Sequence, residues 1–62
     1  IKIMQLFIVR EDLHLKYPIH GDILDAKIAA AFNGGRTALL EIMQDGVVIL
    51  RRHPYNEVWE AV

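Results

Sequence analysis

The chain has 62 residues, no cysteine and a formal net charge of −1, which indicates one small domain, residues 1–62, without disulfides. Apolar residues make up 53% of it, above the usual share, while seven basic residues oppose eight acidic ones. The basic excess that is typical of nucleic-acid-binding proteins is therefore missing. No apolar run approaches the length of a membrane span and no secretory signal is visible, so we expect a cytoplasmic protein without a membrane partner.

The first third of the sequence predicts two strands. Residues 1–9 are almost uniformly apolar, which is typical of a central strand buried on both faces. Glu11-Asp12 follows as a turn, and residues 13–19 then alternate between apolar and polar, as a half-buried strand does. Pro18 lacks a backbone donor, so the second strand lies at an edge of the sheet or ends there.

A helix is predicted over residues 22–33. Asp22 is a good N-cap, and Asn33-Gly34-Gly35 is a helix stop. Alanines at 26 and 29–31 favour the helix and permit close packing. Apolar residues recur at helical spacing, and we expect this stripe to face the core: Leu24, Ile28, Ala31 and Phe32, with Ile23 beside them.

The stretch TALLEIMQDGVVILRR, residues 37–52, predicts a hairpin with a two-residue Asp45-Gly46 turn. A regular ladder from that turn places Met43 opposite Val48 and Glu41 opposite Leu50. Both faces of the hairpin are then apolar. One carries Leu40, Ile42, Val47 and Ile49, and the other carries Leu39, Met43, Val48 and Leu50. Another part of the molecule, or a second molecule, must cover the second face.

The C-terminal residues predict a short amphipathic helix. Tyr55, Val58, Trp59 and Val62 fall at i, i+3, i+4 and i+7 after Pro54, which suits a first helical turn. Eight residues cannot hold a helix in water unaided, so it must pack on another element. Either this helix or the hairpin of a second molecule covers the second hairpin face.

The predicted order of strand, strand, helix, strand, strand and short helix gives a small α+β domain. Over residues 1–52 it resembles the ubiquitin-like β-grasp arrangement, in which one helix packs across a four-stranded mixed sheet. A four-stranded antiparallel sheet flanked by two helices fits the same pattern. The sulfur carriers and modifiers of the β-grasp fold end in Gly-Gly, whereas this chain ends in Glu60-Ala61-Val62, so their activity is not transferred.

Residues 9–13, VREDL, and residues 27–30, KIAA, resemble the opening of the archaeal and eukaryotic type of peptidyl-tRNA hydrolase. That family has an Arg-x-Asp-Leu strand end followed by a Gly-Lys-x-Ala-Ala helix start. Here the spacing is longer, Ala26 stands in place of the glycine, and 62 residues do not contain the rest of the enzyme. The resemblance implies at most a fragment of such an enzyme, and no catalytic residue is carried over.

The residue types present argue against an enzyme. There is no serine or cysteine, and the one threonine, Thr37, has no histidine or lysine near it in sequence. The histidines at 14, 20 and 53 show no metal-binding spacing with one another. No glycine-rich loop precedes the helix, as a phosphate-binding loop would. We predict no catalytic residue, no metal site and no cofactor.

These exclusions, together with the apolar excess, predict a small regulatory or protein-interaction module that self-associates, as a homodimer, or binds another protein. The predicted interface residues are Met43, Val48, Leu50, Tyr55 and Trp59. The alternative is a small nucleic-acid-binding regulator, in which basic side chains contact phosphates near aromatic ones. Its residues would be Arg36, Arg51, Arg52 and His53.

Overall fold

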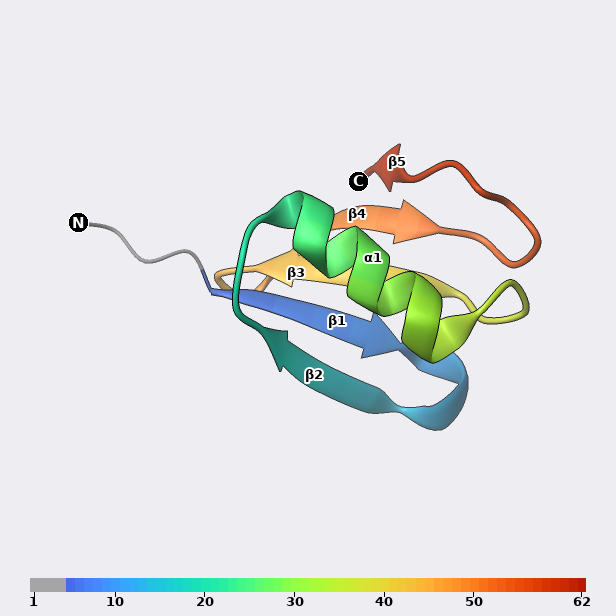
Figure 1. The fold of residues 1–62 in the computed structure, drawn as a ribbon, viewed down its shortest axis with the longest axis horizontal. Coiled ribbons are helices and arrows are strands. Elements are labelled where there is room, and N and C mark those ends of the chain that lie inside the picture. The colour runs from blue at the N-terminus through green and yellow to red at the C-terminus, as the bar shows by residue number, and fades with distance from the viewer. Residues whose placement is uncertain (1–4) are drawn as a thin grey trace.

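The structure is a computed structural model that describes residues 5–62, in which one helix packs on a five-stranded sheet (Figure 1). Its elements are β1 (Leu6–Arg10), a 3-10 turn (Glu11–Leu13), β2 (Leu15–Ile19), α1 (Ile23–Gly34), β3 (Leu40–Gln44), β4 (Val47–Arg52) and β5 (Glu60–Ala61). The strand order is β2-β1-β3-β4-β5. Residues 1–4 of the first predicted strand lie outside the described residues.

The predicted α+β class is confirmed, but the sheet differs from the mixed sheet of a β-grasp arrangement. All four neighbouring strand pairs in the described part of the chain are antiparallel. Because β2 and β3 both run antiparallel to β1, they point the same way, and α1 crosses one face of the sheet to connect them. β1 is central in the sheet, as predicted, and β2 with Pro18 is an edge strand.

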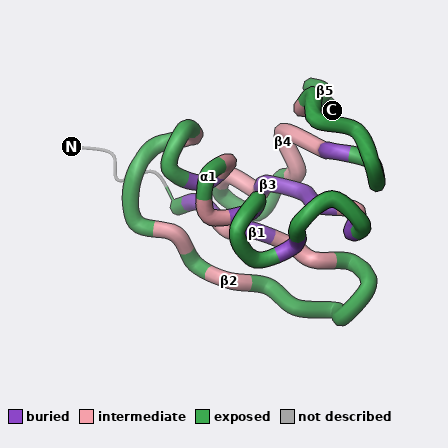
Figure 2. The backbone as a smooth tube through the Cα atoms, turned by 45° about the vertical axis from the view of Figure 1, so that its right-hand side comes forward, coloured by how far each residue is buried: buried purple, intermediate pink, exposed green. Residues whose placement is uncertain are grey.

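The core lies between α1 and the middle of the sheet (Figure 2). Alternate residues of β1 and β3 point toward the helix, and four of them are fully buried: Leu6, Ile8, Leu40 and Ile42. They meet Ala26 and Ala30 of α1, which are also fully buried. Small side chains on the helix let it approach a sheet whose own side chains fill the space between the layers.

The helix begins and ends within one residue of the predicted bounds, because both signals are local. The Asp25 backbone N–H donates to Asp22 Oδ1 at 3.0 Å, and the Asp22 N–H donates to Asp25 Oδ2 at 3.2 Å, which completes a capping box. At the other end Gly35 has φ of 61° and donates its N–H to the carbonyl of Ala31. Gly34 is buried against Leu40, where a Cβ would clash.

The helix presents the opposite face to the core from the one we predicted. Ala26, Ala30 and Gly34 are buried, whereas Leu24, Ile28 and Phe32 are exposed. Both sets follow an i, i+4, i+8 spacing, and a shift of two residues is a rotation of about 200° around the helix. Side-chain size decides between the two faces, since the larger set would hold the helix away from the sheet.

The predicted register of the hairpin agrees with the structure only next to the turn. Gln44 pairs with Val47 and Met43 pairs with Val48, as predicted, but a bulge at Ile49 then shifts the ladder by one residue. Glu41 therefore faces Arg51 instead of Leu50, and Leu50 packs against the helix-side core together with Ile49. The bulge removes Leu50 from the second hairpin face and gives Glu41 a charged partner.

The predicted C-terminal helix is wrong, because residues 53–59 form an irregular connection that returns the chain to β4. β5 then pairs with β4 at the edge of the sheet, with Glu60 opposite Arg51. Trp59 packs against both core clusters from the helix side of the sheet. An eight-residue helix gains little by itself, whereas the extended path partly buries the indole and adds strand pairing.

Candidate interaction surface

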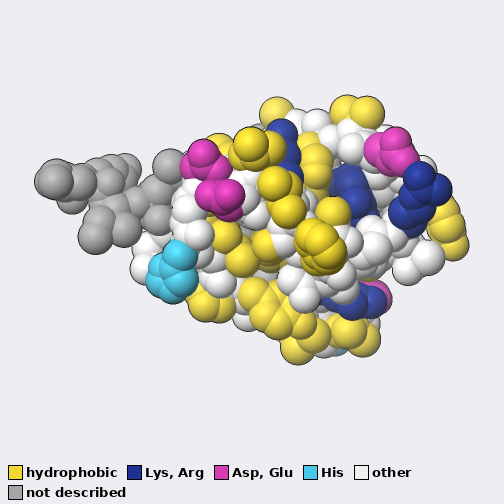
Figure 3. All heavy atoms as spheres, in the orientation of Figure 1, with side chains coloured by type: hydrophobic (Ala, Val, Ile, Leu, Met, Phe, Trp, Pro, Cys, Tyr) yellow, Lys and Arg dark blue, Asp and Glu magenta, His cyan; other side chains and the backbone are white. Residues whose placement is uncertain are grey.

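The outer face of α1 carries the most exposed run of large apolar side chains on any one element of the described chain. Leu24, Ile28 and Phe32 are 64%, 50% and 88% exposed, and we call these three residues the apolar ridge. A shallow hollow lined by Ile28, Ala31 and Phe32 lies beside it. Figure 3 looks onto this side of the molecule and shows hydrophobic side chains gathered over α1. Such a contiguous patch is typical of an interaction site.

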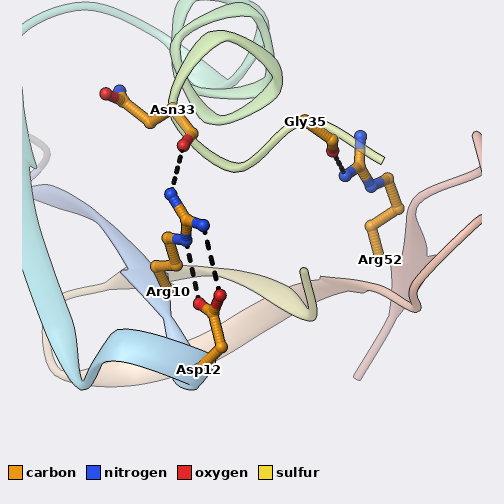
Figure 4. A network of polar contacts seen from close by, with 5 residues as sticks. All are labelled: Arg10, Asp12, Asn33, Gly35 and Arg52. Carbon is orange, nitrogen blue, oxygen red and sulfur yellow. Dashed lines mark hydrogen bonds and ion pairs between the residues drawn. The ribbon is translucent and has the colours of Figure 1, made fainter. Parts of the chain in front are cut away.

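The apolar ridge stands on a well-anchored helix (Figure 4). Arg10 at the end of β1 donates Nη1–H to the carbonyl of Asn33 at 2.6 Å, so a cation meets the C-terminal end of the helix dipole. Two further bonds, of 2.8 and 3.1 Å, join the same guanidinium to the Asp12 carboxylate and lower the pKa of that carboxyl. The capping box holds the other end of α1.

A second surface is the sheet face that points away from α1, which we call the open sheet face. Its half-buried apolar residues are Phe7, Val9, Met43 and Val48. Met43 pairs with both Phe7 and Val48 across the strands, and the Lys16 ammonium lies 4.8 Å from the centre of the Phe7 ring. Long side chains thus cover part of the surface that sequence reasoning left uncovered.

The open sheet face also holds two carboxyl groups and an arginine. Glu41, only 6% exposed, accepts two hydrogen bonds from Arg51, at 2.9 and 2.8 Å. A hydrogen bond between the Glu11 and Glu41 carboxyl groups raises the pKa of Glu11 and lowers that of Glu41, and Arg51 lowers the pKa of Glu41 further. Protonated Glu11 therefore donates its O–H to the Glu41 carboxylate, which also accepts from Arg51.

The five predicted interface residues do not form one surface. Met43 and Val48 are cross-strand neighbours on the open sheet face. Leu50 and Trp59 instead pack against the helix-side core. Tyr55 is 78% exposed, in the connection between β4 and β5, with a φ of 63°. Of the predicted interface residues, Met43 and Val48 therefore lie side by side on the open sheet face, and Tyr55 lies apart from them.

The predicted basic residues are also dispersed, and each has a partner. Arg36 pairs with Glu57 at 2.5 Å, and Arg51 pairs with Glu41 at 2.8 Å. His53 Nε2 lies 3.6 Å from a carboxylate oxygen of Glu60. Arg52 points to the helix side, and Arg51 to the open sheet face. The four side chains therefore offer no single track for a phosphate backbone.

Arg52 is a buried cation, 6% exposed, whose role is structural in this fold. It donates Nη2–H to the carbonyl of Gly35 (Figure 4). Its Cζ atom lies 5.8 Å from the centre of the Trp59 ring. Its Nε–H has no partner among the described residues. The guanidinium joins the loop after α1 to the chain segment before β5.

The described residues contain no group of three or more side chains that could hold a metal ion. Within the same range, no helix has both the length and the apolar character needed to cross a bilayer. Comparison of this chain with protein families, curated proteins and solved structures finds no match.

The sequence does contain a signal for the apolar ridge. Residues 26, 30 and 34 form a small-residue series, and residues 24, 28 and 32 form a large-residue series two positions away. A helix with both series can bury one and expose the other. The small series permits close packing on a sheet and so indicates the buried face, whereas the largest apolar stripe indicates the wrong one.

Proposed function

We propose that this domain is a non-enzymatic protein-interaction module whose contact surface is the outer face of α1. The observation that supports this most directly is the exposure of Phe32, 88%, in line with two other large apolar residues on a capped and anchored helix. Burying such side chains against a partner stabilises a complex by about 1.5–3 kcal/mol for each one that is fully buried. A regulatory role through the partner is part of this proposal.

Nucleic-acid binding through Arg36, Arg51, Arg52 and His53 has less support, because acidic side chains or a backbone carbonyl already engage these groups. The pairs would have to break before phosphates could replace them. The apolar ridge needs no such rearrangement. We therefore favour a protein partner.

The test is site-specific photo-crosslinking in the cells that produce the protein. A benzophenone amino acid replaces Phe32 in one variant and Tyr55 in a matched variant, since both residues are highly exposed aromatics. We expect a covalent protein adduct from position 32, identified by mass spectrometry, and much less from position 55. A variant carrying the probe at 32 that forms no adduct with any protein would overturn the proposal.

A further inference from the structure

The spacing of the apolar ridge allows two helices that carry it to pack against each other. Leu24, Ile28 and Phe32 are spaced by four residues, so they form one of the i±4n ridges along which helices pack. Two such ridges interdigitate when the helices cross at about −50°, the commonest class of helix packing in globular proteins. A ridge of three residues is centred on its middle member, here Ile28.

We propose that the partner at this face is a second copy of the chain, whose α1 packs antiparallel to the first with Ile28 at the twofold axis. This inference rests on the proposed function and names its partner. The axis brings Leu24 of one copy next to Phe32 of the other. The hollow beside Ile28, Ala31 and Phe32 then receives the Leu24 side chain of the second copy.

Charge favours the antiparallel arrangement over the parallel one. Asp22 and Asp25 lie at the start of α1, and within residues 5–62 neither forms an ion pair with a basic side chain. Arg36 follows the end of the helix, and its exposed side chain is already paired with Glu57. Figure 3 shows acidic side chains where α1 begins, and basic and acidic side chains together beyond its other end. A parallel pair would bring the acidic ends of the two copies together, whereas an antiparallel pair separates them and sets the two helix dipoles in opposition.

The size of the surface predicts a reversible dimer. Three large side chains and Ala31 present roughly 400 Å² of apolar surface, about half of the 800 Å² per partner in a standard interface. The complex should therefore dissociate on dilution. The core that the chain buries by itself does not include the ridge, so the separated copies remain folded.

The absence of cysteine from the sequence makes a direct test possible, because single cysteines introduced by mutation give unambiguous disulfides. A disulfide forms only when the two Cα atoms come within about 7 Å. The variants are Ile28→Cys, Leu24→Cys and Phe32→Cys on the ridge, with Met43→Cys on the open sheet face as the matched control. The three ridge positions are exposed, so the substitutions leave the core intact.

Each variant is oxidised at high protein concentration, and the products are identified by mass. We expect Ile28→Cys to become mostly disulfide dimer. Leu24→Cys and Phe32→Cys should link poorly alone but form a mixed disulfide when combined, and Met43→Cys should remain monomeric.

Two patterns would overturn the arrangement. Self-linking of Leu24→Cys and of Phe32→Cys, without the mixed product, would show parallel helices. Linking of Met43→Cys alone would show that the copies meet through the open sheet face. If no ridge variant links while the probe at position 32 captures a different protein, the second copy is wrong but the proposed function stands. If the probe at position 32 forms no adduct with any protein, both the second copy and the proposed function are wrong.

Discussion

At the residue scale, the pair of carboxyl groups on the open sheet face makes stability depend on pH. The folded pKa of Glu11 lies above its ordinary value, chiefly because its protonated form hydrogen-bonds to Glu41. This contribution is fully present below the ordinary glutamate pKa and is lost as the pH rises through the raised value. At neutral pH the two carboxylates repel each other, and Arg51, which hydrogen-bonds to Glu41 alone, offsets only part of this repulsion at Glu11.

Glu11→Gln should therefore raise the melting temperature at neutral pH, because the amide donates to Glu41 without carrying a charge. Near pH 4 the variant and the parent should melt together, since Glu11 is then largely protonated. Thermal melts followed by circular dichroism at both pH values give the comparison. The control is the same substitution made in the Glu41→Gln background. There the double variant and Glu41→Gln alone should show no pH-dependent difference in melting temperature. A gain that is equal at both pH values would show that the carboxyl pair is not its source.

At the scale of the elements, the predictions that depend on local signals are correct, and those that depend on packing between the helix and the sheet are wrong. The capping box and the glycine stop determine the helix bounds, and Asp45-Gly46 sets the hairpin turn, so all three were predicted correctly. The face that α1 buries depends on side chains from β1 and β3 that already fill the space below it. The candidate site was therefore present in the predicted elements, but it was assigned to the core.

The bulge at Ile49 and the path of the last ten residues are decided by tertiary contacts as well. Neither Ile49 nor Leu50 differs locally from its neighbours, and the bulge forms because it buries both and pairs Glu41 with Arg51. Trp59 fits a helical stripe in sequence, but its burial is available only on the helix side of the sheet. Periodicity alone could not distinguish these outcomes.

Close contact between α1 and the sheet can be tested at Gly34. A methyl group there would clash with the Leu40 side chain, which is fully buried, so the clash can be relieved only by shifts in the surrounding core. Gly34→Ala should destabilise the fold by about 1–3 kcal/mol, as overpacking does. The control is the double variant with Leu40→Val, which removes the clashing atoms and should recover part of the loss, so that the two effects do not add. Urea unfolding measures both, and simple additivity would contradict the close contact.

At the scale of the whole molecule, a 62-residue chain without disulfides has few means of gaining stability beyond its core. Its two layers bury one side of α1 and one side of the sheet, which leaves the apolar ridge and the open sheet face on opposite sides. If copies pair through the ridge, association adds to the free energy of unfolding by mass action. Stability and assembly are then coupled, and each can be measured through the other.

The melting temperature of the parent chain should consequently rise with protein concentration, because the dimer unfolds less readily than the separated copies. A ligand at about a hundred times its Kd stabilises by about 2.7 kcal/mol. A gain of about 1 kcal/mol already moves the midpoint of a domain this small by about 4–8 °C. Phe32→Ser should abolish the rise while matching the parent at the lowest concentration, because the ring is exposed and contributes little to the core of one copy. Scanning calorimetry over a concentration series measures both curves. If the melting temperature of the parent does not change with concentration, assembly through the ridge does not contribute to its stability. If the melting temperatures of both proteins rise equally with concentration, the association uses another surface.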